Sequence, residues 1–272
     1  MRSTIASKII GFAFVAAATV GLAAPASATE TTFASFSPVG SNPNVHLTNT
    51  GNALNRATDG TFTSGSPATS SVNVKFSFLL PGISDFVTDV AATYTLTASI
   101  ATNTPAITGA GFAIQPGVAG SMTFVTQNAI LVTGPGFVTH NYLAGSNLLT
   151  VVFSQAALAG QIGSHNLAFS DGTLSGGAVT FTSDFLDFSS TADRDFALSL
   201  TSLNPVVGAA TGVNKSLKSF SGSAGGQFAS DPAALVNGAV PEPATWAMML
   251  LGLLGIGLGL RGRRNGGSFA GA

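Results

Sequence analysis

The strongest constraint on this chain is an uncharged apolar run near its carboxyl end, at residues 244–260. As a helix, these seventeen residues would extend about 25 Å, at the short end of what spans a bilayer. Pro241 and Pro243 disfavour helix, so the helix is expected to begin just after the Pro-Glu-Pro segment. Trp246 suits the headgroup level at one end, and the basic cluster at the other marks the cytoplasmic side. The sequence therefore predicts a single C-terminal transmembrane helix, with the preceding chain outside the cytoplasm.

The alternative for this run is a buried core helix of an ordinary domain. The abrupt arginine cluster and the near-terminal position both disfavour that alternative. A Gly255 and Gly259 pair has the spacing of helix pairing in lipid, although glycine also weakens a helix.

The tail resembles a known sorting signal through a set of matched residues: Pro241, Glu242, Pro243, Trp246, Ala247, Arg261, Arg263 and Arg264. In combination with the apolar run, they resemble the PEP-CTERM sorting signal of Gram-negative bacteria, over residues 240–264. The resemblance implies insertion into the inner membrane and processing by exosortase, an integral-membrane cysteine protease. It also implies delivery to the cell surface or extracellular matrix, often with exopolysaccharide. Chains of that family usually stop just after the arginines, whereas this one continues over residues 265–272.

The start of the chain has the organisation of a secretory signal peptide at residues 1–28. Arg2 and Lys8 form a basic segment, and residues 9–24 are apolar and small. Ala26 and Ala28 form an A-x-A cleavage site, so Thr29 is the expected mature N-terminus. The alternative is an uncleaved N-terminal anchor.

Between these two signals lies a body with few charges and no cysteine. Residues 29–240 contain five basic side chains and ten acidic ones. This acidic balance does not suit nucleic acid, which requires a basic stripe. The absence of cysteine excludes thiol catalysis and thiolate metal sites, so packing must stabilise the body.

Alternating apolar and polar residues predict an all-β body, residues 29–221, followed by a flexible linker at residues 222–239. The expected strands are Val72–Phe78, Thr93–Ile100, Ser121–Thr126, Ala129–Val132, Leu148–Phe153, Asn166–Phe169, Ala178–Thr182, Asp195–Leu203 and Lys215–Ser221. Residues 29–71 are expected to be loops with one or two short edge strands, and Ser154–Leu158 one helical turn. An antiparallel β-sandwich or jelly-roll-like fold is predicted. A parallel β-helix is the alternative, although the sequence has no fixed short repeat.

Few residues of the body form a recognisable chemical motif. His46, His140 and His165 lie far apart, without a second ligand at metal-binding spacing. The G-x-S-x-G and H-E-x-x-H signatures are absent, so no enzyme and no cofactor are predicted. One acidic cluster, with Asp171 upstream and Arg194 among its members, is a weak calcium candidate: Asp184, Asp187, Asp193 and Asp195. The alternative for this cluster is a solvated turn between two strands.

We therefore expect an exported surface or matrix protein, transiently anchored in the inner membrane, whose body is structural. An adhesive or ligand-binding module, for calcium, polysaccharide or ice, is the second hypothesis, and a secreted hydrolase is the third. A regular threonine ladder on a sheet face would favour ice, and converging carboxylates would favour calcium. A polar cleft with paired acids would favour the hydrolase.

Overall fold

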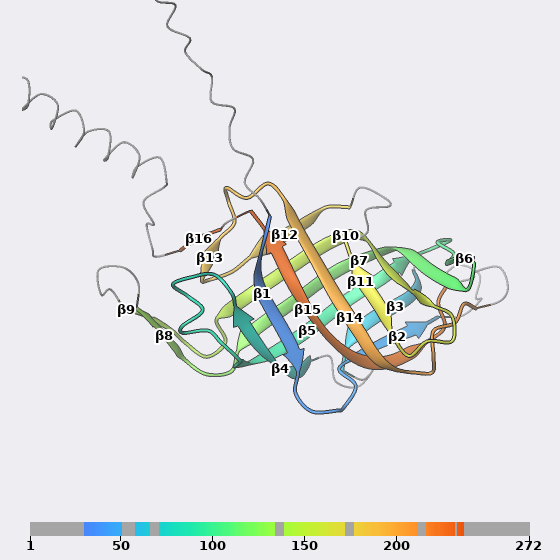
Figure 1. The fold of residues 1–272 in the computed structure, drawn as a ribbon, viewed down its shortest axis with the longest axis horizontal. Coiled ribbons are helices and arrows are strands. Elements are labelled where there is room, and N and C mark those ends of the chain that lie inside the picture. The colour runs from blue at the N-terminus through green and yellow to red at the C-terminus, as the bar shows by residue number, and fades with distance from the viewer. Residues whose placement is uncertain are drawn as a thin grey trace, which may run out of the picture.

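The fold consists of β-strands, and the computed structural model describes residues 30–50, 58–65, 71–133, 139–171, 177–210, 216–231 and 233–236. These residues contain no helix (Figure 1). The strands are β1 Thr31–Pro38, β2 Val45–Asn49, β3 Thr58–Ser64, β4 Ser71–Phe78, β5 Val90–Ala101, β6 Ile107–Gly109, β7 Phe112–Thr126, β8 Ile130–Thr133, β9 Thr139–Tyr142, β10 Asn147–Gln161, β11 Leu167–Ser170, β12 Val179–Thr182, β13 Leu186–Asp187, β14 Arg194–Asn204, β15 Phe220–Ser230 and β16 Ala234–Leu235.

The main sheet closes on itself through antiparallel pairs. Strands β1, β4, β5, β7, β10, β11, β14 and β15 each pair with the next, and β15 pairs back with β1. Strands β3 and β2 form a second connection between β5 and β15: β3 pairs with β5, β2 pairs with β15, and β2 and β3 pair with each other. Strand β12 pairs with β10, as β11 does. The prediction of an antiparallel all-β body is confirmed. Its main sheet is continuous, whereas a sandwich has two separate sheets facing each other.

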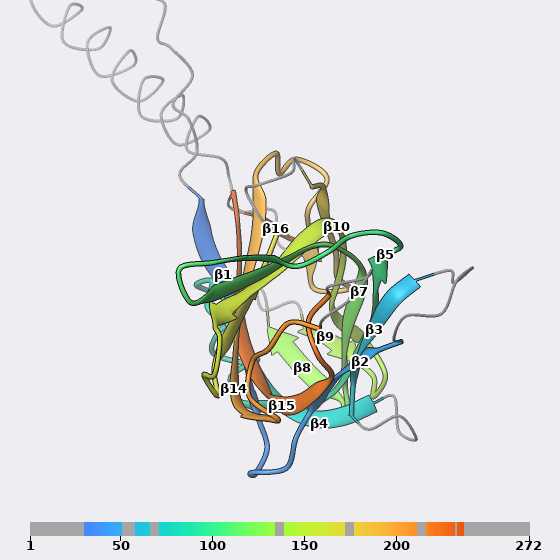
Figure 2. The same ribbon diagram turned by 90° about the vertical axis from the view of Figure 1, so that its right-hand side faces the viewer.

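The closed sheet has two broad faces that cross at a large angle. Figure 1 shows β1, β14 and β15 in front of β5, β7 and β10, and Figure 2 shows β1, β14 and β15 on the opposite side of the core from β5 and β7. Short hairpins and connections extend from the ends of this body, including the separate pairs β8–β9 and β13–β16.

Alternation along the strands fills the interior with aromatic rings. Phe36 of β1, Tyr94 of β5, Phe124 of β7 and Phe228 of β15 meet there, with ring centroids 4.8 Å apart for Phe36–Phe124 and 5.5 Å apart for Phe124–Phe228. Alternate apolar side chains of β4 and β14 face inward, because they are buried or half-buried: Val72, Val74, Phe76 and Phe78, and Phe196, Leu198 and Leu200.

Three local predictions were wrong. Residues 31–38, 45–49 and 58–64 form strands with partners on both sides, rather than loops and edge strands. Their partners lie far along the chain, so the polar local sequence did not reveal them.

The expected helical turn at Ser154–Leu158 lies inside strand β10. Gln155 has a φ of 59°, and the register with β7 shifts between Phe153 and Ala156. This bulge interrupts the two-residue alternation, which is why the segment resembled a helical turn in sequence.

The expected linker from Gly222 begins inside strand β15, which runs to Ser230 between β1 and β14. Its small residues allow close approach of neighbouring backbones. A Cβ at Gly226 would lie 2.8 Å from the Ala197 carbonyl oxygen, and one at Gly225 would lie 3.2 Å from the Phe36 carbonyl oxygen. Glycine is therefore a packing requirement here, although the same composition is typical of linkers. Of the predicted strand Lys215–Ser221, only Phe220 and Ser221 belong to β15.

We predict that Gly120→Ala destabilises the body, because a Cβ there would lie 2.2 Å from the Thr97 carbonyl oxygen on β5. The free energy of unfolding in urea is expected to fall by about 1–3 kcal/mol. Gly109→Ala is the matched control, since its added Cβ would meet nothing within 4 Å. Equal stability of the two variants would contradict the close β5–β7 approach.

Candidate functional site

The residues of the expected sorting signal lie outside the described residues, and so do those of the expected signal-peptide cleavage site. They are Pro241, Glu242, Pro243, Trp246, Ala247, Arg261, Arg263 and Arg264, with Ala26, Ala28 and Thr29. Within the part of the chain that the structure describes, no helix is long and apolar enough to cross a membrane. What the structure does show is where the body meets each of these segments.

Both ends of the described body lie at one end of the closed sheet (Figure 1). Thr31 at the start of β1 is paired with Ser230 at the end of β15. The last described segment is held there too, because the Val236 N–H donates to the Phe185 carbonyl at 3.0 Å. We call this the exit end, defined by Thr31, Ser230 and Val236.

Acidic side chains gather at the exit end and affect one another. Burial, followed by the charges of Asp195, Asp193 and Asp231, raises the pKa of Glu30. The Asp231 Oδ2 accepts hydrogen bonds from the backbone N–H groups of Ala192 and Asp193, at 3.0 and 3.3 Å. These contacts join the end of β15 to the turn before β14.

Asp171 and Asp195 lie close enough to affect each other. Burial raises the pKa of Asp171 to about 7, and the hydrogen bond and charge of Asp195, together with the charge of Glu30, add to this effect. Near neutral pH, a protonated Asp171 can therefore donate to the Asp195 carboxylate. The pair joins the end of β11 to β14, whose strands are already paired from Leu167 to Ser170.

The four calcium candidates have separate partners. The Asp184 Oδ2 accepts from the Asn147 N–H at 2.7 Å, and the Asp187 Oδ1 accepts from the Ser189 N–H at 2.9 Å. Asp195 pairs with Asp171, and the backbone of Asp193 bonds to Asp231. Among the described residues, no group of three or more His, Cys, Asp or Glu side chains could hold a metal ion.

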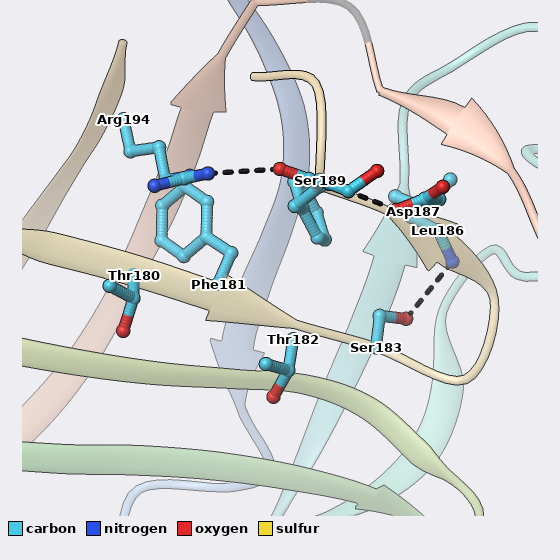
Figure 3. A pocket seen from close by; sticks show the side chains of 9 residues that line it. Thr180, Phe181, Thr182, Ser183, Leu186, Asp187, Ser189 and Arg194 are labelled. Carbon is cyan, nitrogen blue, oxygen red and sulfur yellow. Dashed lines mark hydrogen bonds between the residues drawn. The ribbon is translucent and has the colours of Figure 1, made fainter. Parts of the chain in front are cut away.

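Arg194 lines a surface cavity of about 360 Å³ beside β12 and β13 (Figure 3). Its Nη2 donates to the carbonyls of Phe188 and Thr191, at 2.9 and 2.8 Å, and its Nε donates to the Thr191 hydroxyl at 3.0 Å. The guanidinium thus holds the turn after β13. Hydroxyl groups of Thr180, Thr182 and Ser183 also line the cavity, together with apolar side chains such as Phe181 and Leu186.

The three histidines are placed on different elements. His46 lies in β2 and His140 in β9, whereas His165 precedes β11 and its Nδ1 is 2.8 Å from the Leu203 carbonyl oxygen. They therefore do not combine into one site.

A face that the sequence analysis did not identify carries cross-strand rows of hydroxyl groups. One row crosses five strands, from β4 through β5, β7 and β10 to β12: Ser71, Thr95, Thr123, Thr150 and Thr182. The adjacent row runs from β3 to β12 and carries a hydroxyl at each position except Val152: Thr63, Thr97, Ser121, Val152 and Thr180. We call these two rows the hydroxyl face. No Asp, Glu, Lys or Arg occurs from Val90 to Ser170, and the alternating Thr93, Thr95 and Thr97 were the available local signal.

We predict that the stability of the body decreases as pH rises from about 4 to 7, because the folded pKa of Asp171 is about 7 and its ordinary value is 3.8. Across that window the unfolded chain loses this proton while the folded body retains it. In Asp171→Asn, whose amide still donates to Asp195, the decrease should be smaller. Urea unfolding of both proteins between pH 4 and 8 measures it. Identical pH profiles would contradict the shared proton.

Comparison with known proteins gives one match, in the tail. No curated protein and no solved structure shows significant similarity to the chain. Residues 239–264 match the PEP-CTERM protein-sorting motif, and they include all eight tail residues on which the resemblance was based. The motif implies export, sorting at the membrane and processing by an exosortase. The chain therefore carries a PEP-CTERM protein-sorting motif at its C-terminal end.

Proposed function

We propose that this protein is exported, held in the inner membrane by its tail, and released by an exosortase-type protease to the cell surface or extracellular matrix. The observation that carries the proposal is the sorting motif at residues 239–264. In the released protein the body has a structural role and no catalytic one, and exopolysaccharide is its expected neighbour. The proposal includes cleavage of the signal peptide before Thr29.

The exit end supports this order of events. The motif begins three residues after Val236, so the body ends almost where the tail begins. Five residues lead from Val236 to Pro241, and a chain of that length reaches at most about 18 Å. A protease acting near the Pro-Glu-Pro segment would therefore work close to the exit end of a folded body.

The interior supports a structural role for the body. Aromatic rings from both broad faces pack against one another there, as Phe124 does against Phe36 and Phe228. The threonines of the hydroxyl face are half-buried or exposed on the outside of the sheet, where they are available to neighbours.

We predict that Glu242→Ala, or Arg263→Ala with Arg264→Ala, blocks sorting and leaves the body folded. The change removes either the acidic residue of the motif or its basic stop. Cell fractionation should find these variants retained in the inner membrane, while Lys75→Ala, an exposed substitution on β4, is delivered normally. Equal surface delivery of all variants would contradict the proposal, and mass spectrometry of the mature chain would locate both processed ends.

A second candidate function is binding of an ice surface by the hydroxyl face. The specific observation is the threonine ladder, in which Thr95, Thr123 and Thr150 are successive cross-strand partners. Neighbouring strands are about 4.8 Å apart, and alternate residues of a strand about 6.6 Å apart, which gives a two-dimensional array of hydroxyl and methyl groups. Neither row contains a charged or aromatic side chain, so the face lacks the stacking platform of a typical sugar site.

We predict that Thr97→Lys with Thr123→Lys abolishes any incorporation of the full-length chain, held in lipid nanodiscs, into slowly grown ice. The two lysines would interrupt both rows with bulky, hydrated charges. Ser199→Lys with Thr201→Lys adds the same charge to exposed positions of β14 and is the matched control. Exclusion of the unmodified protein from ice, at the level of empty nanodiscs, would rule out this candidate.

A further inference from the structure

A small apolar surface lies beside the point where the tail leaves the body. The hairpin β8–β9 is not part of the main sheet, and its inner residues Ile130 and Val132 are buried. On its outside, Leu131 is 61% exposed, and Leu143, just after β9, is 65% exposed. We call Leu131 and Leu143 the hairpin leucines.

The hairpin is joined to the exit end by direct contacts. Tyr142 of β9 stacks on Phe185, with ring centroids 3.9 Å apart, and the Phe185 carbonyl accepts the hydrogen bond from Val236. Val236 itself is 47% exposed. Figure 1 shows β8 and β9 at the same end of the body as β13 and β16. Three exposed apolar side chains, Leu131, Leu143 and Val236, therefore lie around the start of the tail.

The length of chain beyond Val236 limits how far this surface can be from lipid. Eight residues lead from Val236 to the first residue of the apolar run, Ala244, and they reach at most about 28 Å. Strand β10 starts at the exit end with Asn147, and its fifteen residues extend over about 45 Å. The opposite end of β10, where Gln161 pairs with Phe112, is thus far more distant from the tail.

We propose that the hairpin leucines rest on the membrane surface while the tail is inserted, so that the body contacts lipid at its exit end. This contact rests on the proposed function, because it requires the tail to be in the bilayer. Once the tail anchors the body, contact with lipid becomes an intramolecular step with a high effective concentration. A few exposed leucines then suffice, although they would not bind a membrane without the anchor.

The charges around the hairpin determine which lipid surface is preferred. No Asp, Glu, Lys or Arg occurs between Val90 and Ser170, so the hairpin has none of these side chains, and His140 lies on its strand β9. Asp85 lines a cavity together with Leu131, and Asp184 bonds to Asn147 nearby. These carboxylates are repelled by anionic headgroups, so the contact is stronger on zwitterionic lipid, and salt reduces the difference.

The chain has no cysteine, so single-cysteine variants can report on this contact without background labelling. Leu131→Cys and Leu143→Cys place an environment-sensitive dye at the hairpin leucines. Ile107→Cys is the matched control, because Ile107 is also an exposed apolar residue, at 60%, but lies on β6 at the opposite end. The full-length variants are reconstituted in phosphatidylcholine vesicles that contain lipids with a quencher at headgroup depth.

We expect blue-shifted, quenched emission from the dyes at positions 131 and 143 and neither effect at position 107. Adding anionic lipid at low salt should weaken the quenching at 131 and 143. Equal, water-like emission at all three positions, in chains that resist carbonate extraction, would overturn the contact and leave the anchor intact. Extraction of the chain by carbonate would overturn both the anchor and the contact.

Discussion

The pairing of β15 with β1 is the interaction on which the rest of the body depends. It joins Thr31 to Ser230 and closes the sheet, so that each of the eight strands in the closed series has a partner on both sides. The closure requires glycines in β15, because Gly225 and Gly226 lie against the backbones of β1 and β14. It also encloses the aromatic core and brings both ends of the body to the same side.

Sequence reasoning succeeded where the determining signal was local. Strict alternation identified β4 and β14, and a short motif identified the sorting signal. It failed where partners are distant or where alternation breaks, as at the bulge around Gln155 and in the glycine-rich β15. The composition of β15 is typical of a linker, and only its position between two backbones shows why it must be small.

In the candidate sites too, the residue types were visible in the local sequence, whereas their contacts depend on strand pairing. The acidic residues near β14 were visible in sequence, but their pairing was not, because Asp171 and Asp195 meet only through the β11–β14 register. The cross-strand rows likewise depend on pairing over five strands, so Thr95, Thr123 and Thr150 become neighbours only in the folded sheet. A set of locally unremarkable threonines thus acquires a two-dimensional order that no single segment contains.

The position of β15 also has a mechanical consequence. While the tail is anchored and the body is pulled by its surroundings, the load first reaches β16, which is paired with β13, and then enters the main sheet through the carboxyl end of β15. That strand lies between antiparallel neighbours on both sides, so a pull along its axis stresses many hydrogen bonds in shear at the same moment rather than opening them one after another. The architecture is therefore suited to bearing tension at its point of attachment.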